Sequence, residues 1–202
     1  MTRTSLEQLA KAPRWPNEQT LALGGQVRGN ALRNWGVHVR RRFGASAPDR
    51  VRELVGLGTD VMPDEPTKKH WLPIHAQIRM VQVIVDEYLD GDAMRFDNVF
   101  EDTTGGAEKV LVMAGRMAGP GMVLRMAGNY HQSVCDVGKC TPIVNGGSAT
   151  LDFQGAAVFN NPTWRFAQAL AMKAMFATLK KPLDAIEGEG GQDAFKIHMR
   201  WR

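Results

Sequence analysis

Hydrophobic residues recur every three or four positions along most of the chain before Asp136, a spacing that predicts amphipathic helices. The clearest helix is predicted over residues 72–89, where one apolar stripe is formed by Ile74, Ile78, Val81, Val85 and Tyr88. An earlier helix is predicted over residues 30–43, with an apolar face made of Leu32, Trp35, Val39 and Phe43. Shorter helices are predicted over residues 46–55, 93–100, 107–117 and 120–134.

The hydrophobic period changes to two after Asp136, which predicts strands. Residues 141–144 and 148–154 form a predicted hairpin around Asn145-Gly146-Gly147, because these turn residues tolerate positive φ. A helix is then predicted over residues 163–179. A second hairpin joins residues 183–187 to 194–201 through a glycine-rich turn at 188–191. In its last strand the apolar residues alternate strictly with polar ones; they are Phe195, Ile197, Met199 and Trp201.

These elements predict an α+β fold, in which N-terminal helices pack on one face of a small antiparallel sheet. The predicted order is helices, β-hairpin, helix, β-hairpin. Residues 1–25, with two prolines and weak periodicity, are interpreted as an N-terminal arm. Residues 26–202 are interpreted as a single α+β domain, with a helical part at 26–135 and a sheet-containing part at 136–202.

Composition narrows the class of protein further. The chain has 202 residues, of which 44% are hydrophobic and 23% are charged, as in ordinary globular domains. No apolar run approaches the roughly 18–20 residues of a membrane span. Two cysteines are too few for a disulfide framework, so we expect a cytoplasmic protein. The net charge of +4 includes a cluster at Arg40–Arg42, which we interpret as a solvated helix end rather than a nucleic-acid surface.

Three sequence features together carry a family resemblance: a helix ending in Arg-Arg-Phe-Gly, a helix start at Leu72-Pro73, and a terminal strand Phe-x-Ile-x-Met-Arg-Trp. On the basis of these features, residues 25–201 resemble a paralogous myxobacterial family of similar length and unknown function. That family resembles a superfamily that contains 4-vinyl-reductase-type domains, haem–nitric-oxide-binding domains and TRAPP-complex subunits. The resemblance implies a non-enzymatic domain that senses a small molecule or binds a protein in signalling or regulation. It also implies a homodimer paired through its helices.

Two departures from that superfamily limit what the resemblance implies about cofactors. The segment around the last hairpin lacks the cysteines that 4-vinyl-reductase-type domains often carry there. The haem-sensing Tyr-x-Ser-x-Arg signature is also absent, because Tyr130-His131-Gln132-Ser133 has neither its spacing nor its arginine. Since a shared fold does not imply a shared function, we predict no cofactor and keep zinc or haem as alternatives.

One cluster has residue types that suit a metal: His131, Cys135 and Cys140. His131 and Cys135 are four residues apart, which places both on one face of a helix, and Cys140 follows just before a strand. Three such ligands with an open fourth position would suit zinc. The alternative function is therefore a metal- or thiol-dependent enzyme centred on these three residues. The competing interpretation is two buried, reduced thiols, since free cysteine is usually a small buried hydrophobe.

Methionine is the second unusual feature, with eleven residues in the chain. Six methionines and one tyrosine fall in helices predicted to face the sheet: Met113, Met117, Met122, Met126, Tyr130, Met172 and Met175. Flexible thioethers line adaptable apolar pockets and interfaces, and they also fill ordinary cores. We predict that Met117, Met122, Met126, Tyr130 and Met175 point inward. The seven side chains either fill the core or line a pocket for a small apolar ligand or an interface with a protein partner.

Overall fold

The computed structural model describes residues 2–57, 61, 70–96 and 115–202. The protein contains a five-stranded antiparallel sheet with the order β1-β6-β7-β5-β4. Four of its strands come from the C-terminal part of the chain, and β1 comes from the N-terminus. The strands are β1 (Thr4–Ser5), β4 (Lys139–Asn145), β5 (Ser148–Gln154), β6 (Leu183–Gly191) and β7 (Ala194–Trp201). The predicted α+β class and the order helices, hairpin, helix, hairpin are confirmed.

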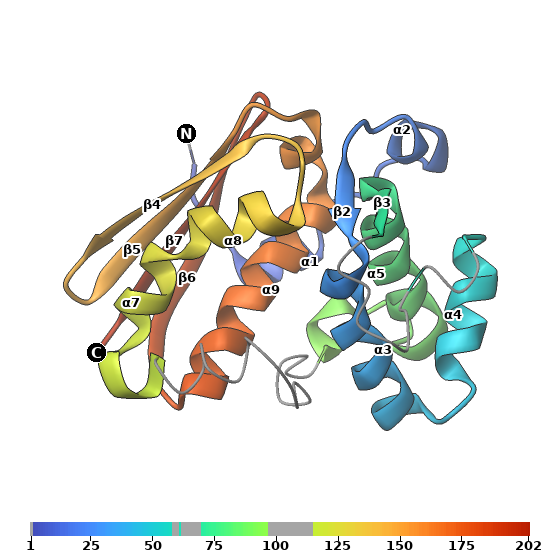
Figure 1. The fold of residues 1–202 in the computed structure, drawn as a ribbon, viewed down its shortest axis with the longest axis horizontal. Coiled ribbons are helices and arrows are strands. Elements are labelled where there is room, and N and C mark those ends of the chain that lie inside the picture. The colour runs from blue at the N-terminus through green and yellow to red at the C-terminus, as the bar shows by residue number, and fades with distance from the viewer. Residues whose placement is uncertain (1, 58–60, 62–69, 97–114) are drawn as a thin grey trace.

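One face of the sheet is covered by three helices: α7 (Pro120–Arg125), α8 (Ala127–Val134) and α9 (Pro162–Leu179), as Figure 1 shows. The strand residues on that face are buried, as their alternation predicts: Leu151, Phe153, Phe195, Ile197, Met199 and Trp201. Helix α9 begins after Asn161, whose side-chain oxygen accepts a hydrogen bond from the backbone nitrogen of Trp164 at 3.0 Å. The proline at the first helical position suits this start, because its missing N–H would have no helical partner there.

The helical part stands beside the sheet in Figure 1 and is built mainly from α3, α4 and α5. The helices and short turns are α1 (Leu6–Ala10), α2 (Asn17–Leu21), α3 (Gly29–Phe43), α4 (Ala47–Val55), α5 (Ile74–Tyr88), η2 (Ala93–Arg95) and η3 (Ala157–Asn160). A two-stranded ribbon, β2 (Gln26–Arg28) with β3 (Trp71–Pro73), holds the start of α5 against that of α3. Within the described residues, every helix is too short or too polar to cross a bilayer.

Several predicted boundaries are wrong. The helix predicted from residue 72 begins at Ile74, because residues 71–73 pair with β2. The helix predicted over residues 120–134 is divided at Met126. The glycine-rich turn predicted at 188–191 belongs to β6, and the chain turns at residues 192–193 instead. Glycine is needed inside this strand because a Cβ at Gly188 would lie 2.8 Å from the ring of Phe195.

The N-terminal segment lies against the sheet-containing part. Thr4 and Ser5 pair with Gly188 and Glu187 of β6, and Leu6 is buried in the core. Ser5 caps α1 by accepting a hydrogen bond from the backbone of Gln8 at 3.3 Å. The division of the chain into an arm and a domain stays a prediction. Two further helices were predicted at residues 93–100 and 107–117. Residues 97–114, which include parts of both, lie outside the described part of the chain.

Candidate functional site

His131 lies at the centre of the predicted metal cluster and is buried between α8 and the sheet. Helix α8 turns this side chain inward, where its ring meets Phe153 edge-on at 5.6 Å and Phe159 at 6.0 Å between centroids. Its Nε2 donates a hydrogen bond to the backbone oxygen of Val137 at 3.0 Å. Burial lowers the pKa of the His131 imidazole, so the neutral ring is favoured in the folded protein.

The two cysteines are buried free thiols. The Cys135 thiol donates to the same Val137 oxygen, with the sulfur 3.7 Å away, so the predicted spacing of four does bring His131 and Cys135 to one point. Cys140 lies on β4 opposite Phe153. Burial raises the pKa of the Cys135 thiol, and burial with the nearby Asp152 carboxylate raises the pKa of the Cys140 thiol to about 12.

This arrangement favours buried, protonated thiols over reactive thiolates. A thiolate is the form that attacks substrates and binds metals, and a raised pKa makes it scarce at neutral pH. No group of three His, Cys, Asp or Glu side chains in the described part of the chain is arranged to hold a metal ion. The zinc hypothesis for His131, Cys135 and Cys140 stays a prediction, and elemental analysis of the purified protein tests it.

The buried His131 gives a prediction for pH dependence. In the unfolded chain His131 has its ordinary pKa of about 6.5, whereas in the folded protein its pKa is lower. Below about pH 6.5 the unfolded chain therefore binds more protons at His131 than the folded chain does, which favours unfolding. We therefore expect stability to fall as the pH drops below about 6.5, by up to about 1.4 kcal/mol per pH unit. The variant His131→Gln keeps an N–H donor for the Val137 oxygen and cannot titrate, so it should lose this part of the pH dependence.

Urea denaturation of the wild type and of His131→Gln between pH 7 and about 5 measures the difference between their slopes. The pKa of His75 is also lowered by burial, but it contributes equally to both proteins and cancels in the comparison. A matched variant, His70→Gln, makes the same substitution at an exposed histidine and measures the effect of the change itself. Equal slopes for the wild type and His131→Gln would contradict the prediction.

The seven predicted ligand or interface residues do not form one surface. Met113 lies outside the described residues, and Met172 and Met175 are half-buried on α9, where they pack against the core. The other four are exposed, which corrects their predicted inward orientation: Met117 by 88%, Met122 by 42%, Met126 by 43% and Tyr130 by 49%. We call these four residues the Met–Tyr stripe.

The orientation of the Met–Tyr stripe follows from how α7 and α8 pack on the sheet. Val123, Leu124 and His131 occupy the inward face. Gly128 allows a close approach, because a Cβ there would lie 2.7 Å from the backbone oxygen of Cys140. Met122, Met126 and Tyr130 are left exposed on the side turned away from the sheet. The sequence shows two apolar stripes here, and helical periodicity alone does not say which one is buried.

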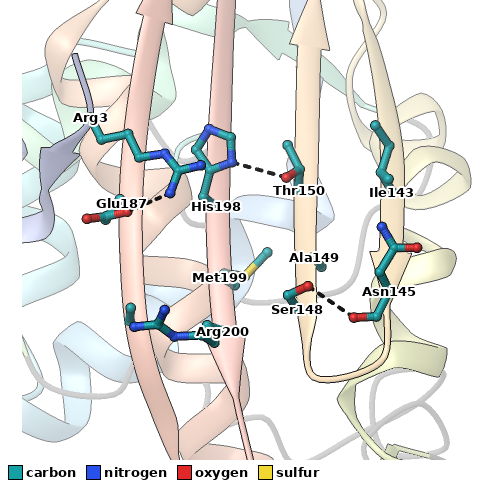
Figure 2. Close-up of a pocket in the computed structure, with 11 residues that line it drawn as sticks. Arg3, Ile143, Asn145, Ser148, Ala149, Thr150, Glu187, His198, Met199 and Arg200 are labelled. Carbon is teal, nitrogen blue, oxygen red and sulfur yellow. Dashed lines mark hydrogen bonds and ion pairs between the residues drawn. The ribbon is translucent and has the colours of Figure 1, made fainter. Parts of the chain in front are cut away.

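Sequence reasoning missed a second feature, on the sheet face opposite α9. A hollow of about 450 Å³ lies there, lined by residues of the N-terminal segment and of strands β4, β5, β6 and β7. Figure 2 shows Arg3, His198 and Arg200 around it. The alternation in β5 and β7 predicts that their polar residues face outward, but the pairing of the strands is needed to bring them together.

Comparison with solved structures relates the fold to known domains, whereas no family model and no curated protein sequence matches the chain. One similar structure comes from work on haem distortion in the H-NOX family, with a TM-score of 0.55 and 12% identity over 87% of this chain and 95% of that one. Another is an H-NOX mutant that carries 4-cyano-L-phenylalanine, with a TM-score of 0.51 and 13% identity over 87% and 96%. A third is a doubly substituted H-NOX protein, at 0.50 and 12% over 87% and 95%. The predicted resemblance to the haem–nitric-oxide-binding superfamily is thus confirmed for the fold, while membership of the paralogous family is untested.

Proposed function

We propose that this chain is a non-enzymatic signalling or regulatory domain that acts through protein contacts, and that the Met–Tyr stripe docks a second copy of the chain. The exposure of four large apolar side chains, Met117 just before α7 and the other three along α7 and α8, is the observation that supports this function. Exposed apolar patches on a folded domain mark interaction sites, and methionine adapts its shape to a partner.

We propose that the partner bound at the Met–Tyr stripe is a second copy of the chain, which forms a symmetric dimer. In a twofold contact the same patch serves both partners, so an exposed apolar patch such as the Met–Tyr stripe can pack against its own copy. Met126 lies midway between Met122 and Tyr130, four residues from each, and would lie at the centre of such a contact. The superfamily resemblance, which implies pairing through helices, supports the same arrangement.

Haem does not fit the space beside His131, although solved H-NOX structures concern haem proteins. Of the two buried histidines, His38 and His131, His131 already uses its Nε2 on the Val137 oxygen. Phe153 and Phe159 pack against its ring and fill the space beside it. The smaller of the two hollows described, between α1, α5 and α9, is about 20 Å³, enough for about one water molecule. The proposed function therefore includes no haem chemistry.

The variant Met126→Arg is expected to convert the dimer to a monomer. It places a charge at the centre of the contact, where burial without a partner is costly, so self-association should weaken at least about tenfold. Because Met126 is 43% exposed, the folded monomer should tolerate the change. Sedimentation velocity over a range of concentrations measures the dissociation constant.

A matched variant, Gln132→Arg, adds the same charge to α8 at another exposed position and should leave self-association unchanged. Circular dichroism and thermal unfolding show whether either variant alters the fold. A monomeric wild type at all concentrations, or equal weakening by both variants, would overturn the assignment of a second copy to the Met–Tyr stripe.

A further inference from the structure

The hollow on the open face of the sheet has the volume of a small-molecule site. Its volume of about 450 Å³ is within the roughly 300–1,000 Å³ typical of ligand pockets. It lies across β5 and β7, with β4 on one side and β6 and the N-terminal segment on the other, as Figure 2 shows. These strands pair along much of their length, so the floor of the hollow is rigid backbone.

Strand register gathers polar side chains on this floor. Ser148 pairs with Arg200 across β5 and β7, and Thr150 pairs with His198 in the next outward-facing row. His198 is fixed from two sides, because its Nδ1 lies 3.1 Å from Thr150 Oγ1 and its Nε2 lies 3.1 Å from Glu189 Oε2. A floor held by such hydrogen bonds needs little reordering when a ligand binds.

Positive charge exceeds negative charge among the lining residues. Arg3 reaches over the strands from the N-terminal segment and contacts Glu187 at 3.3 Å, and its side chain is 57% exposed. Arg200 is exposed, and its neighbours across the strands, Ser148 and Ala185, are neutral. Arg200 has no hydrogen-bonding or ion-pairing partner within the described residues, so its guanidinium donors are available to a ligand. Guanidinium groups bind carboxylate and phosphate groups through paired hydrogen bonds.

An apolar surface borders the same hollow. Ile143 of β4 is 51% exposed and faces the hollow from the side opposite Arg3, as Figure 2 shows. An apolar group placed on Ile143 would remove that surface from water. From these features we propose that the hollow binds a small organic anion, whose carboxylate or phosphate head contacts Arg200 and Arg3 and whose apolar part covers Ile143.

Phenyl phosphate is a suitable probe because it combines a phosphate head with a compact apolar ring. We expect it to cause saturable chemical-shift changes at the backbone amides of β5 and β7 in a heteronuclear NMR titration. Inorganic phosphate should bind more weakly at the same amides, because it leaves Ile143 uncovered. The variant Arg200→Gln should weaken binding of phenyl phosphate about tenfold, since it removes a charge-assisted contact.

The control variant Arg125→Gln removes the same charge from α7, on the other face of the sheet, and should bind phenyl phosphate like the wild type. Absence of saturable shifts at millimolar probe, or equal weakening by Arg200→Gln and Arg125→Gln, would overturn the proposal. Met126→Arg should retain full binding. The anion site and the dimer contact can therefore succeed or fail independently.

Discussion

Replacing Phe159 with alanine is expected to lower the free energy of unfolding by about 3–5 kcal/mol. Phe159 is completely buried in η3, between the sheet and the helices that cover it. Its ring lies 4.9 Å from Trp164, 5.8 Å from Phe153 and 6.0 Å from His131 between centroids. These rings are held by α9, β5 and α8, so their positions relax little and truncation leaves a cavity.

Urea denaturation followed by tryptophan fluorescence measures this loss. The control variant Ile143→Ala truncates a half-exposed side chain on β4 and should cost less than about 1 kcal/mol. A loss for Phe159→Ala no larger than that of Ile143→Ala would show that the aromatic cluster does not hold the sheet against its helices.

Phe159 also shows where sequence periodicity stops being informative. It lies in a four-residue 3-10 turn between β5 and α9, too short to display a period of either two or 3.6. By contrast, β5, β7 and α5 extend over many residues, and the apolar stripes predicted from alternation and helical spacing are buried, except that Tyr88 of α5 is half-buried. The fold class follows from these long elements, because their order already fixes which layers can form.

Beyond the two predicted hairpins, the pairing of the short strands is the part of the fold that the sequence did not show. The short strand β1 joins the edge of the sheet through two residues only, and β2 pairs with β3 across more than forty residues of chain. Neither pair has a hydrophobic pattern long enough to detect. Glycine was misleading in β6, where Gly188 and Gly190 make room for Phe195 and Arg165 instead of forming a turn.

The candidate sites also differ in whether sequence spacing or strand pairing reveals them. A spacing of four predicted that His131 and Cys135 share a helix face, and both do reach the Val137 oxygen. The anion hollow combines Arg3, Ile143 and Arg200 from three distant segments, so only strand register reveals it. The Met–Tyr stripe was recognised by composition but oriented wrongly, since the packing of Gly128 against β4 decides which side of α8 is buried.

Replacing Gly138 with alanine is expected to cost about 2–5 kcal/mol, for two separable reasons. Gly138 has a φ of +66°, which costs an L-residue about 1–2 kcal/mol. An added Cβ would also overlap the ring of Phe159 and lie 2.9 Å from the backbone oxygen of Gln154, which adds an overpacking cost of about 1–3 kcal/mol. The free energy of unfolding in urea measures the sum.

A control variant and a double mutant separate the two causes. Gly155 also has a positive φ, +85°, but a Cβ there meets nothing within 4 Å, so Gly155→Ala should cost only the backbone part, about 1–2 kcal/mol. The overpacking part of the cost should come largely from the ring of Phe159. Gly138→Ala should therefore cost less in a Phe159→Ala background than in the wild type, because the cavity left by the ring accepts the new methyl group. Strict additivity of the two substitutions would contradict this contact, whereas a coupling of about 1 kcal/mol or more would establish that the bend before β4 closes directly onto the aromatic cluster.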